Sequence, residues 1–495
     1  MQFTLKRIIA TFICMLVMLC NAQVSRAEIR TYEGVGEYIM SDFETPDIAK
    51  QRAKARAEQS AAEQAGVYVK SYTRTVNNTL VEDEIVAIAN MIIKITDVQY
   101  TTTPTSESGG SFQIVAKIHA TVDSDRIDEW LKRDQQKNRE LVEQNKQLQA
   151  DKAKLDAELV DLRNKLSQVA NAQEKQTLEK KVVSTDSKFL ANQKIEEGWR
   201  LYSDEQYAEA LAMFTQSISL NGNNSIAYYG RGTAYYAQGK YTQAIVDFNM
   251  AIALNPNIAE SYCNRGLAYD SQGRYSQAIA DYNKAIAINP NFAKAYNNRG
   301  VSYAKQDNYT QAIVDFTKAI VINSTDAELY YNRGLSYAKQ GNYPQAINDY
   351  NKAIDLNQNY ADAYKHRGMT YSYQGNHSQA IADLTKAIAL NPNNADAYYN
   401  RGTVYAHQGK HRQAIADYNK TIVLNPNYYV AYCNRGCVYG MLGNHDQAIA
   451  DLTKSIALNP NYATAYINRG LVYEQLGNIR QANADFAKAK ELSGR

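Results

Sequence analysis

Small and aromatic residues recur in a fixed helical pattern along the C-terminal part of this chain. The copy that spans residues 259–292 has two helical faces, each built at positions i, i+4 and i+7: Tyr262, Gly266 and Tyr269, then Ala278, Tyr282 and Ala285. Gly273 separates the two faces, and Pro290 follows the second because proline cannot extend a helix. The pattern predicts an antiparallel pair of helices joined by a tight turn.

The same pattern returns every 34 residues, marked by an arginine that precedes a glycine. These arginines are Arg231, Arg265, Arg299, Arg333, Arg367, Arg401, Arg435 and Arg469. A fixed period of this length indicates one unit stacked on copies of itself, each burying its apolar face against its neighbours. Such a stack offers a long surface for binding and seldom a closed pocket, so the pattern favours binding over catalysis.

The spacing of these residues resembles the tetratricopeptide repeat. We count about nine copies over residues 191–495. The resemblance implies a mainly α fold, a right-handed α-solenoid of about nine helix hairpins. It also implies that the first helices line a concave surface where a protein or peptide partner is bound.

One position departs from the family pattern, because arginine stands where leucine is common before the glycine. The arginine lies eight residues before the turn glycine, and an aspartate lies eight residues after it. We expect buried ion pairs, with Arg265–Asp281, Arg299–Asp315 and Arg333–Asp349 as examples. The first copy has Glu197 and Met213 at these places and lacks both partners. An exposed arginine ladder for anionic ligands is the alternative.

Asparagine before the arginine is a second recurrent polar feature. It occurs at Asn264, Asn298, Asn332, Asn400, Asn434 and Asn468. By repeat position the row resembles the inner-surface asparagines of O-linked N-acetylglucosamine transferase, which implies contacts to an extended peptide backbone. An amide suits this role because it is both donor and acceptor. Further partner contacts are expected from the preceding residues Tyr229, Tyr331, Tyr399 and Lys365. The alternative is a solvated residue copied with its repeat.

The N-terminus has the pattern of a signal peptide over residues 1–27. Lys6 and Arg7 precede an apolar run that ends at Cys20, and the run is shorter than a membrane-spanning helix. Cys20 offers a possible lipid anchor, although Leu19 before it does not fit a lipobox. We therefore expect export to the periplasm or cell envelope, or secretion, with membrane attachment only through such an anchor.

Residues 28–133 have a different pattern of apolar and polar residues and are expected to form a small α+β domain. Alternating apolar residues predict strands at 29–39, 67–76, 92–103 and 112–122, and an alanine-rich segment predicts a helix from Thr45 to Gly66. A turn is expected at 108–110. Segments such as Gly34-Val35-Gly36 and residues 53–69 resemble the N-terminal-like domain of flagellar assembly protein T and the LPP20 lipoprotein family. That resemblance implies an envelope location and no catalytic motif.

Residues 134–181 are predicted to form a coiled coil. Apolar residues recur every seven positions at Leu141, Leu148, Leu155, Leu162 and Val169, and Leu159 and Leu166 extend the alternate seam. Asn145 and Lys152 are polar seam positions, which favour a defined two-stranded register. We expect a homo-oligomerising spacer that separates its flanking domains by about 75 Å at 1.5 Å per residue. A single solvated helix is the alternative.

Residues that could carry chemistry are scattered. The six histidines form no ligand set, and no cofactor, metal or nucleotide site is expected. We expect Cys263, Cys433 and Cys437 to be small buried apolar side chains, because three cysteines cannot make a disulfide framework. The net charge of +3, with both signs interleaved, argues against nucleic acid.

Three classes of function follow. The favoured one is a non-catalytic envelope scaffold that binds a partner protein on its repeats. The alternative is a structural spacer or tether that acts through residues 28–133 and the coiled coil. The third, an enzyme, has no supporting motif.

Overall fold

The computed structural model describes residues 28–40, 45–75, 82–105, 112–132 and 135–494. The chain divides into two compact units, Met1–Gln272 and Gly273–Arg495. The signal segment 1–27 and the turn at 108–110 lie outside the described residues. Each unit is considered on its own below.

The first unit begins with a three-stranded antiparallel sheet in the order β1-β3-β2. Its strands are β1 (Ile29–Met40), β2 (Lys94–Pro104) and β3 (Phe112–Asp123). Helix α2 (Pro46–Thr75) covers one face. Gly34 and Gly36 allow β1 to approach the backbone of α2 closely. A Cβ added at Gly34 would lie 2.0 Å from the Ala57 carbonyl oxygen, and one added at Gly36 would lie 2.1 Å from that of Ala53.

Three of the four expected strands are present, but the strand expected at 67–76 is wrong. Helix α2 continues through Gly66 to Thr75, so the predicted helix was too short. Ala65, Tyr68 and Val69 are buried at i, i+3 and i+4, and this helical spacing decides the conformation of the segment. The sequence analysis also missed the short helix α3 (Glu82–Ile92).

The expected coiled-coil segment folds back on itself. After α4 (Ser124–Lys132), helix α5 (Gln135–Gln168) packs along α6 (Ala172–Ser203) of the same chain. Asn171 caps the N-terminus of α6, and its side-chain oxygen accepts hydrogen bonds from the backbone N–H groups of Gln173 and Glu174. The expected extended spacer is therefore replaced by a helix hairpin.

This hairpin covers most of the heptad seam within one chain. The seam residues with buried side chains are Asn145, Leu148, Lys152, Leu159, Leu162 and Leu166. Leu159 and Leu162 pack against Val182 of α6. The single solvated helix is not what forms, and the seam expected at a dimer interface is occupied by the chain itself.

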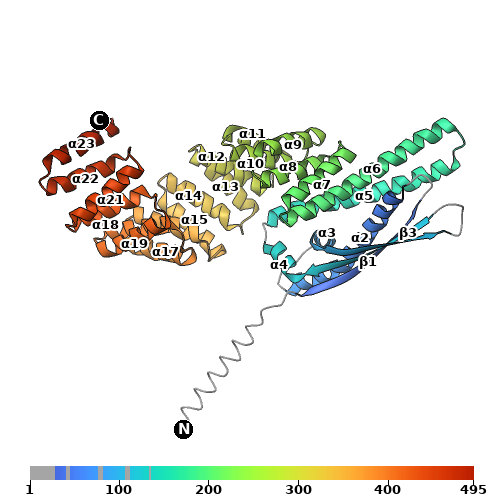
Figure 1. The fold of residues 1–495 in the computed structure, drawn as a ribbon, viewed down its shortest axis with the longest axis horizontal. Coiled ribbons are helices and arrows are strands. Elements are labelled where there is room, and N and C mark those ends of the chain that lie inside the picture. Colours follow the sequence, from blue (N-terminus) through green and yellow to red (C-terminus); the bar gives the residue numbers. More distant parts are fainter. Residues whose placement is uncertain (1–27, 41–44, 76–81, 106–111, 133–134, 495) are drawn as a thin grey trace, which may run out of the picture. The chain divides into compact units, whose positions relative to one another are not determined.

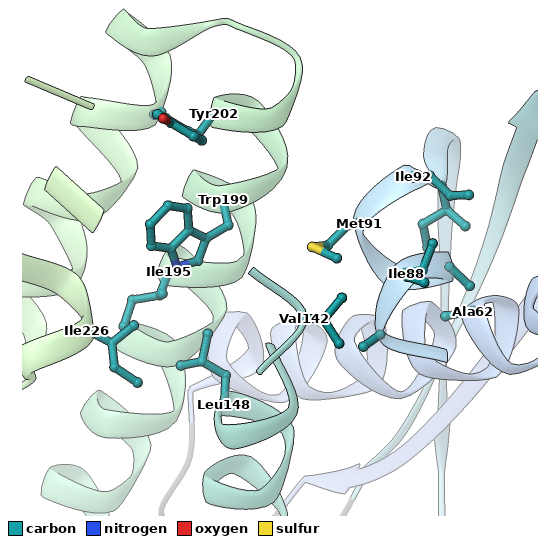
Figure 2. Close-up of a cluster of buried hydrophobic side chains, with 14 of the residues drawn as sticks. Ala62, Ile88, Met91, Ile92, Val142, Leu148, Ile195, Trp199, Tyr202 and Ile226 are labelled. Carbon is teal, nitrogen blue, oxygen red and sulfur yellow. The ribbon is translucent and has the colours of Figure 1, made fainter. Parts of the chain in front are cut away.

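A buried cluster joins the N-terminal domain to the hairpin and to the first repeats (Figure 2). Its side chains come from α2, α3, α5, α6 and α8 (Ser225–Ala237): Ala62, Ile88, Met91, Ile92, Val142, Leu148, Ile195, Trp199, Tyr202 and Ile226. Arg52 of α2, which is 1% exposed, forms ion pairs with Asp156 of α5 and Asp186 of α6. The domain is thus packed on the hairpin within the first unit.

The remaining chain is a succession of helix hairpins (Figure 1). In the first unit the C-terminal part of α6 packs on α7 (Tyr207–Leu220), α8 packs on α9 (Tyr241–Leu254), and α10 (Ala259–Ser271) follows. The second unit begins with α11 (Tyr275–Ile288) and continues with α12 (Ala293–Lys305), α13 (Tyr309–Ile322), α14 (Ala327–Lys339), α15 (Tyr343–Leu356), α16 (Ala361–Tyr373), α17 (His377–Leu390), α18 (Ala395–His407), α19 (His411–Leu424), α20 (Tyr429–Met441), α21 (His445–Leu458), α22 (Ala463–Gln475) and α23 (Ile479–Ser493).

The two helices of a hairpin approach closely at the glycine after the arginine. At Gly300 an added Cβ would lie 2.8 Å from the Phe316 ring, and at Gly334 it would lie 2.9 Å from the Tyr350 ring. The degenerate first copy keeps this contact between Gly198 and Phe214. Packing of a large apolar side chain on this glycine, a ring in most copies and a leucine at Gly368 and Gly436, therefore occurs even where the ion pair is missing.

Within the described residues, the helices are too short or too polar to cross a membrane.

Candidate functional site

The recurrent arginines and aspartates lie together inside their hairpins. In seven of the eight copies the guanidinium donates through Nε and Nη2 to the two oxygens of one carboxylate at 2.6–2.8 Å. The pairs are Arg231–Asp247, Arg299–Asp315, Arg333–Asp349, Arg367–Asp383, Arg401–Asp417, Arg435–Asp451 and Arg469–Asp485. These aspartates are 1–10% exposed and the arginines 16–20%. Arg265 lies in the first unit and Asp281 in the second.

Each arginine also reaches the preceding repeat. Its Nη1 group donates to an asparagine or threonine sixteen residues earlier, as Arg333 does to Thr317 and Arg367 to Asn351. The same contact is made to Thr215, Asn249, Asn283, Thr385, Asn419 and Thr453. This contact was not predicted from the sequence, although asparagine or threonine stands at the position in every copy except the last, which has Ala487.

An aromatic ring completes the environment of the arginine. The tyrosine three residues before it lies 5.4–5.8 Å from the guanidinium carbon: Tyr228, Tyr262, Tyr296, Tyr330, Tyr364, Tyr398, Tyr432 and Tyr466. Hydrogen bonds to Asp349 keep the pKa of Arg333 above its ordinary value, although burial acts in the opposite direction. The bonds of Arg333 use three of its five N–H donors, and Asp349 compensates its charge, which disfavours an anionic ligand at this place.

The predicted asparagine row forms hydrogen bonds between successive repeats. Asn264 donates to the hydroxyl of Tyr229 at 2.6 Å, and Asn434 donates to that of Tyr399 at 3.1 Å. Asn332 donates to Asn297 at 3.2 Å and Asn468 to Cys433 Sγ at 3.4 Å. All six asparagines, with Asn298 and Asn400, are half-buried. The row thus contributes to the stacking of repeats while part of each side chain stays accessible.

An amide group has two N–H donors and a carbonyl acceptor. In Asn434 the bond to Tyr399 uses one N–H. The amide is also hydrogen-bonded to the hydroxyl of Tyr418, so its carbonyl oxygen is the group that can accept the N–H of one peptide unit. The two readings of the row, structural and peptide-binding, are therefore compatible in one side chain.

Aromatic side chains flank the row in the second unit. The ring of Tyr331 lies 5.0 Å from that of Tyr360 and 5.5 Å from the imidazole of His366. Tyr399 lies 5.1 Å from Tyr428 in the same arrangement, two repeats later. Burial raises the pKa of both Tyr331 and Tyr399, so the hydroxyls stay protonated, and that of Tyr331 is hydrogen-bonded to His366 Nδ1 at 3.1 Å.

The other two predicted contact residues differ from these. Tyr229 is buried, 2% exposed, and packs on Trp199 and Phe248, so its role is mainly structural. The ammonium of Lys365 pairs with Asp362 at 2.7 Å and is not a free cation. The accessible part of the row in the second unit is therefore amide and phenol rather than charge.

His366, which interrupts the row, gives a pH prediction. Burial and then the charge of Lys365 lower its pKa below the ordinary 6.5, so the folded chain favours the neutral imidazole. Above the unfolded pKa the group has no effect on stability. Below it the unfolded chain binds the proton more readily, so stability is lost as the pH falls through about 6.5.

We expect His366→Asn, which restores the asparagine of the other copies, to reduce this loss between about pH 6.5 and pH 5. Urea unfolding of both chains at the two pH values measures it. An identical pH dependence in wild type and variant would contradict the assignment.

The comparisons with known proteins agree on the repeat. A family model for the tetratricopeptide repeat matches residues 259–292, 293–326, 327–360, 395–428 and 429–462. A second model for the TPR repeat matches 232–273 and 368–409, and a third tetratricopeptide model matches 463–494. Together these matches cover more than half of the 495 residues. The curated proteins give no significant match.

Several solved structures are similar to part of the chain. YrrB, described as a TPR protein with an unusual peptide-binding site, is 28% identical over 37% of this chain and 95% of its own, with a TM-score of 0.33. MamA is 32% identical over 32% of this chain and 94% of its own, with a TM-score of 0.31. A tetratricopeptide repeat protein from Parabacteroides merdae ATCC 43184 is 23% identical over 49% of this chain and 95% of its own, with a TM-score of 0.41.

Proposed function

Because the chain belongs to the tetratricopeptide repeat family, whose members are typically non-enzymatic interaction scaffolds, we propose that it binds an extended segment of a partner protein along its asparagine row. The partner lies across the first helices of the second unit. The chain performs no chemistry on it.

The observation that carries this proposal is the division of roles among the recurrent polar residues. The arginines are held by a carboxylate and by the preceding repeat, as at Arg333, so they stabilise the hairpins. The asparagines use their amide N–H groups for bonds to the preceding repeat and to nearby side chains, as at Asn332 and Asn434, so the carbonyl oxygen is the group offered to a partner backbone N–H. A surface of half-buried amides and phenols suits a peptide backbone better than it suits an anion.

The place of action is the cell envelope in this proposal. It rests on the signal-peptide pattern of residues 1–27 and on the N-terminal α+β domain. In the first unit that domain is fixed to the hairpin by Arg52, which pairs with Asp156 and Asp186. The domain then anchors the repeats at the envelope, and the row captures the partner.

Site-specific photo-crosslinking in intact cells tests the proposal. We expect a photoreactive amino acid in place of Asn332 or Asn400, both in the row, to give one defined crosslinked protein. The same residue in place of Lys352 or Lys386, which are exposed on second helices, is the matched control and should not.

A triple variant, Asn298→Ala, Tyr331→Ala and Asn332→Ala, then separates binding from tethering. Loss of the crosslink from Asn400 with an unchanged circular dichroism spectrum supports binding on the row. An unchanged set of crosslinked proteins, with a cellular defect only on deleting residues 28–133, would instead support the spacer or tether.

A further inference from the structure

Two cysteines lie one turn apart on helix α20. Cys433 and Cys437 occupy positions i and i+4, so their Cβ atoms lie about 5–6 Å apart on one face. Both are free thiols; Cys433 is buried and Cys437 is half-buried. The two side chains are hydrogen-bonded to each other. This is a thiol pair on a rigid element with access from one side.

Neighbouring side chains donate to the inner sulfur. Asn468 of the next repeat donates its Nδ2–H to Cys433 Sγ at 3.4 Å, and Tyr462 is also hydrogen-bonded to Cys433. Hydrogen bonds from Cys437, and then from Asn468 and Tyr462, lower the pKa of the Cys433 thiol although burial opposes this. The pKa of Cys437 is raised in turn by its bond to Cys433. Asn468 therefore places an N–H donor against the sulfur of Cys433, where it would stabilise a metal-bound thiolate.

A soft cation can replace the two thiol protons. Within the described part of the chain there is no group of three or more His, Cys, Asp or Glu side chains that could hold a metal ion, so a four-coordinate zinc site is not formed here. Two thiolates select soft monovalent ions such as Cu(I). With a metal–sulfur distance of about 2.3 Å, a linear site needs sulfurs roughly 4.5 Å apart, which the i, i+4 spacing permits.

We propose that Cys433 and Cys437 form a two-coordinate site for a soft monovalent metal ion, with Cu(I) as its ligand. Two S–H bonds break and two Cu–S bonds form. The two protons pass to solvent, and copper stays Cu(I). The site gains one net negative charge, which the donors of Asn468 and Tyr462 stabilise.

The chain contains its own matched control. Cys263 occupies the place of Cys433 in an earlier repeat and is likewise buried, but Leu267 stands one turn later, where α20 has Cys437. Cys263 therefore offers one buried thiol at the matching repeat position without a second sulfur one turn later, and Phe292 stands in the sequence where the pair has Tyr462.

Anaerobic titration with Cu(I) against the chelator bicinchoninate tests the proposal. The full chain is used with Cys14→Ser and Cys20→Ser, so that only three thiols remain. We expect one Cu(I) per chain held against the chelator, and the same for Cys263→Ser. Cys433→Ser and Cys437→Ser should each lose that equivalent, while circular dichroism shows the helices unchanged.

Two outcomes would overturn the site. One is that the parent chain holds no more Cu(I) than the Cys437→Ser variant. Cys437 is half-buried, so its substitution disturbs the packing less than Cys433→Ser does. The other is loss of binding in Cys263→Ser, which would place the ion elsewhere. X-ray absorption of the loaded chain should show two sulfur neighbours, and three or more would also contradict the proposal.

Discussion

Replacing Arg299 with alanine is expected to destabilise its hairpin by about 3–5 kcal/mol, because it leaves the carboxylate of Asp315 buried without its partner. Asp315 is 1% exposed, and both of its oxygens accept from the arginine. The bond from Arg299 to Asn283 of the preceding repeat is lost as well. Hydrogen exchange measured by mass spectrometry should show this as faster exchange in α12 and α13.

The matched control removes both charges. Arg299→Leu with Asp315→Leu leaves no buried ion without a partner, and apolar replacement of a buried pair is often close to neutral. We therefore expect the double variant to be much milder than Arg299→Ala, with a urea midpoint near that of the wild type. Equal damage from the two changes would show that the pair itself, rather than the unpaired carboxylate, decides stability.

The repeated part of the fold could be predicted because each copy repeats the same constraints. A glycine such as Gly300 accepts the ring of Phe316, and this contact depends on residues a fixed distance apart in one hairpin. The pattern in one copy is therefore tested by all the others. The family models match the copies from residue 232 onward.

The N-terminal part was harder to predict, because the conformation of its residues depends on packing against residues distant in the sequence. Residues 67–76 alternate well enough for a strand, but Tyr68 and Val69 are buried on a continuing helix that packs against the sheet. The heptads at 134–181 show only that one helix needs another. They do not show that the second helix, α6, follows in the same chain.

In the candidate site, too, contacts within one hairpin could be predicted and contacts between repeats could not. The fixed distance from arginine to aspartate indicates a contact within one hairpin, and the structure places seven such pairs in contact. The bonds from Asn434 to Tyr399 and from Arg333 to Thr317 join neighbouring repeats, so they depend on how the hairpins stack. Spacing within one copy does not determine that stacking.

Replacing Gly36 with alanine is expected to have the second large effect, because strand β1 lies directly on the backbone of α2. The added Cβ would meet the Ala53 carbonyl oxygen at 2.1 Å and the Ala57 nitrogen at 2.4 Å, far inside normal contact distance. A helix backbone cannot move aside as a flexible side chain does, so the strand must separate from the helix. We expect a cost of about 3 kcal/mol or more, above the usual range for overpacking.

Gly66→Ala is the matched control for Gly36→Ala, since it adds the same methyl group to the same domain. There the nearest atom is the Cγ2 of Ile85 at 3.3 Å, a side-chain methyl that can shift. Alanine also gains about 1 kcal/mol of helix propensity over glycine within α2. We expect Gly66→Ala to change stability by less than about 1 kcal/mol. Hydrogen exchange of β1 and β3 should then accelerate strongly in Gly36→Ala alone. Equal protection in both variants would mean that the sheet does not depend on this close approach, and that Gly36 could be replaced without moving β1 from α2.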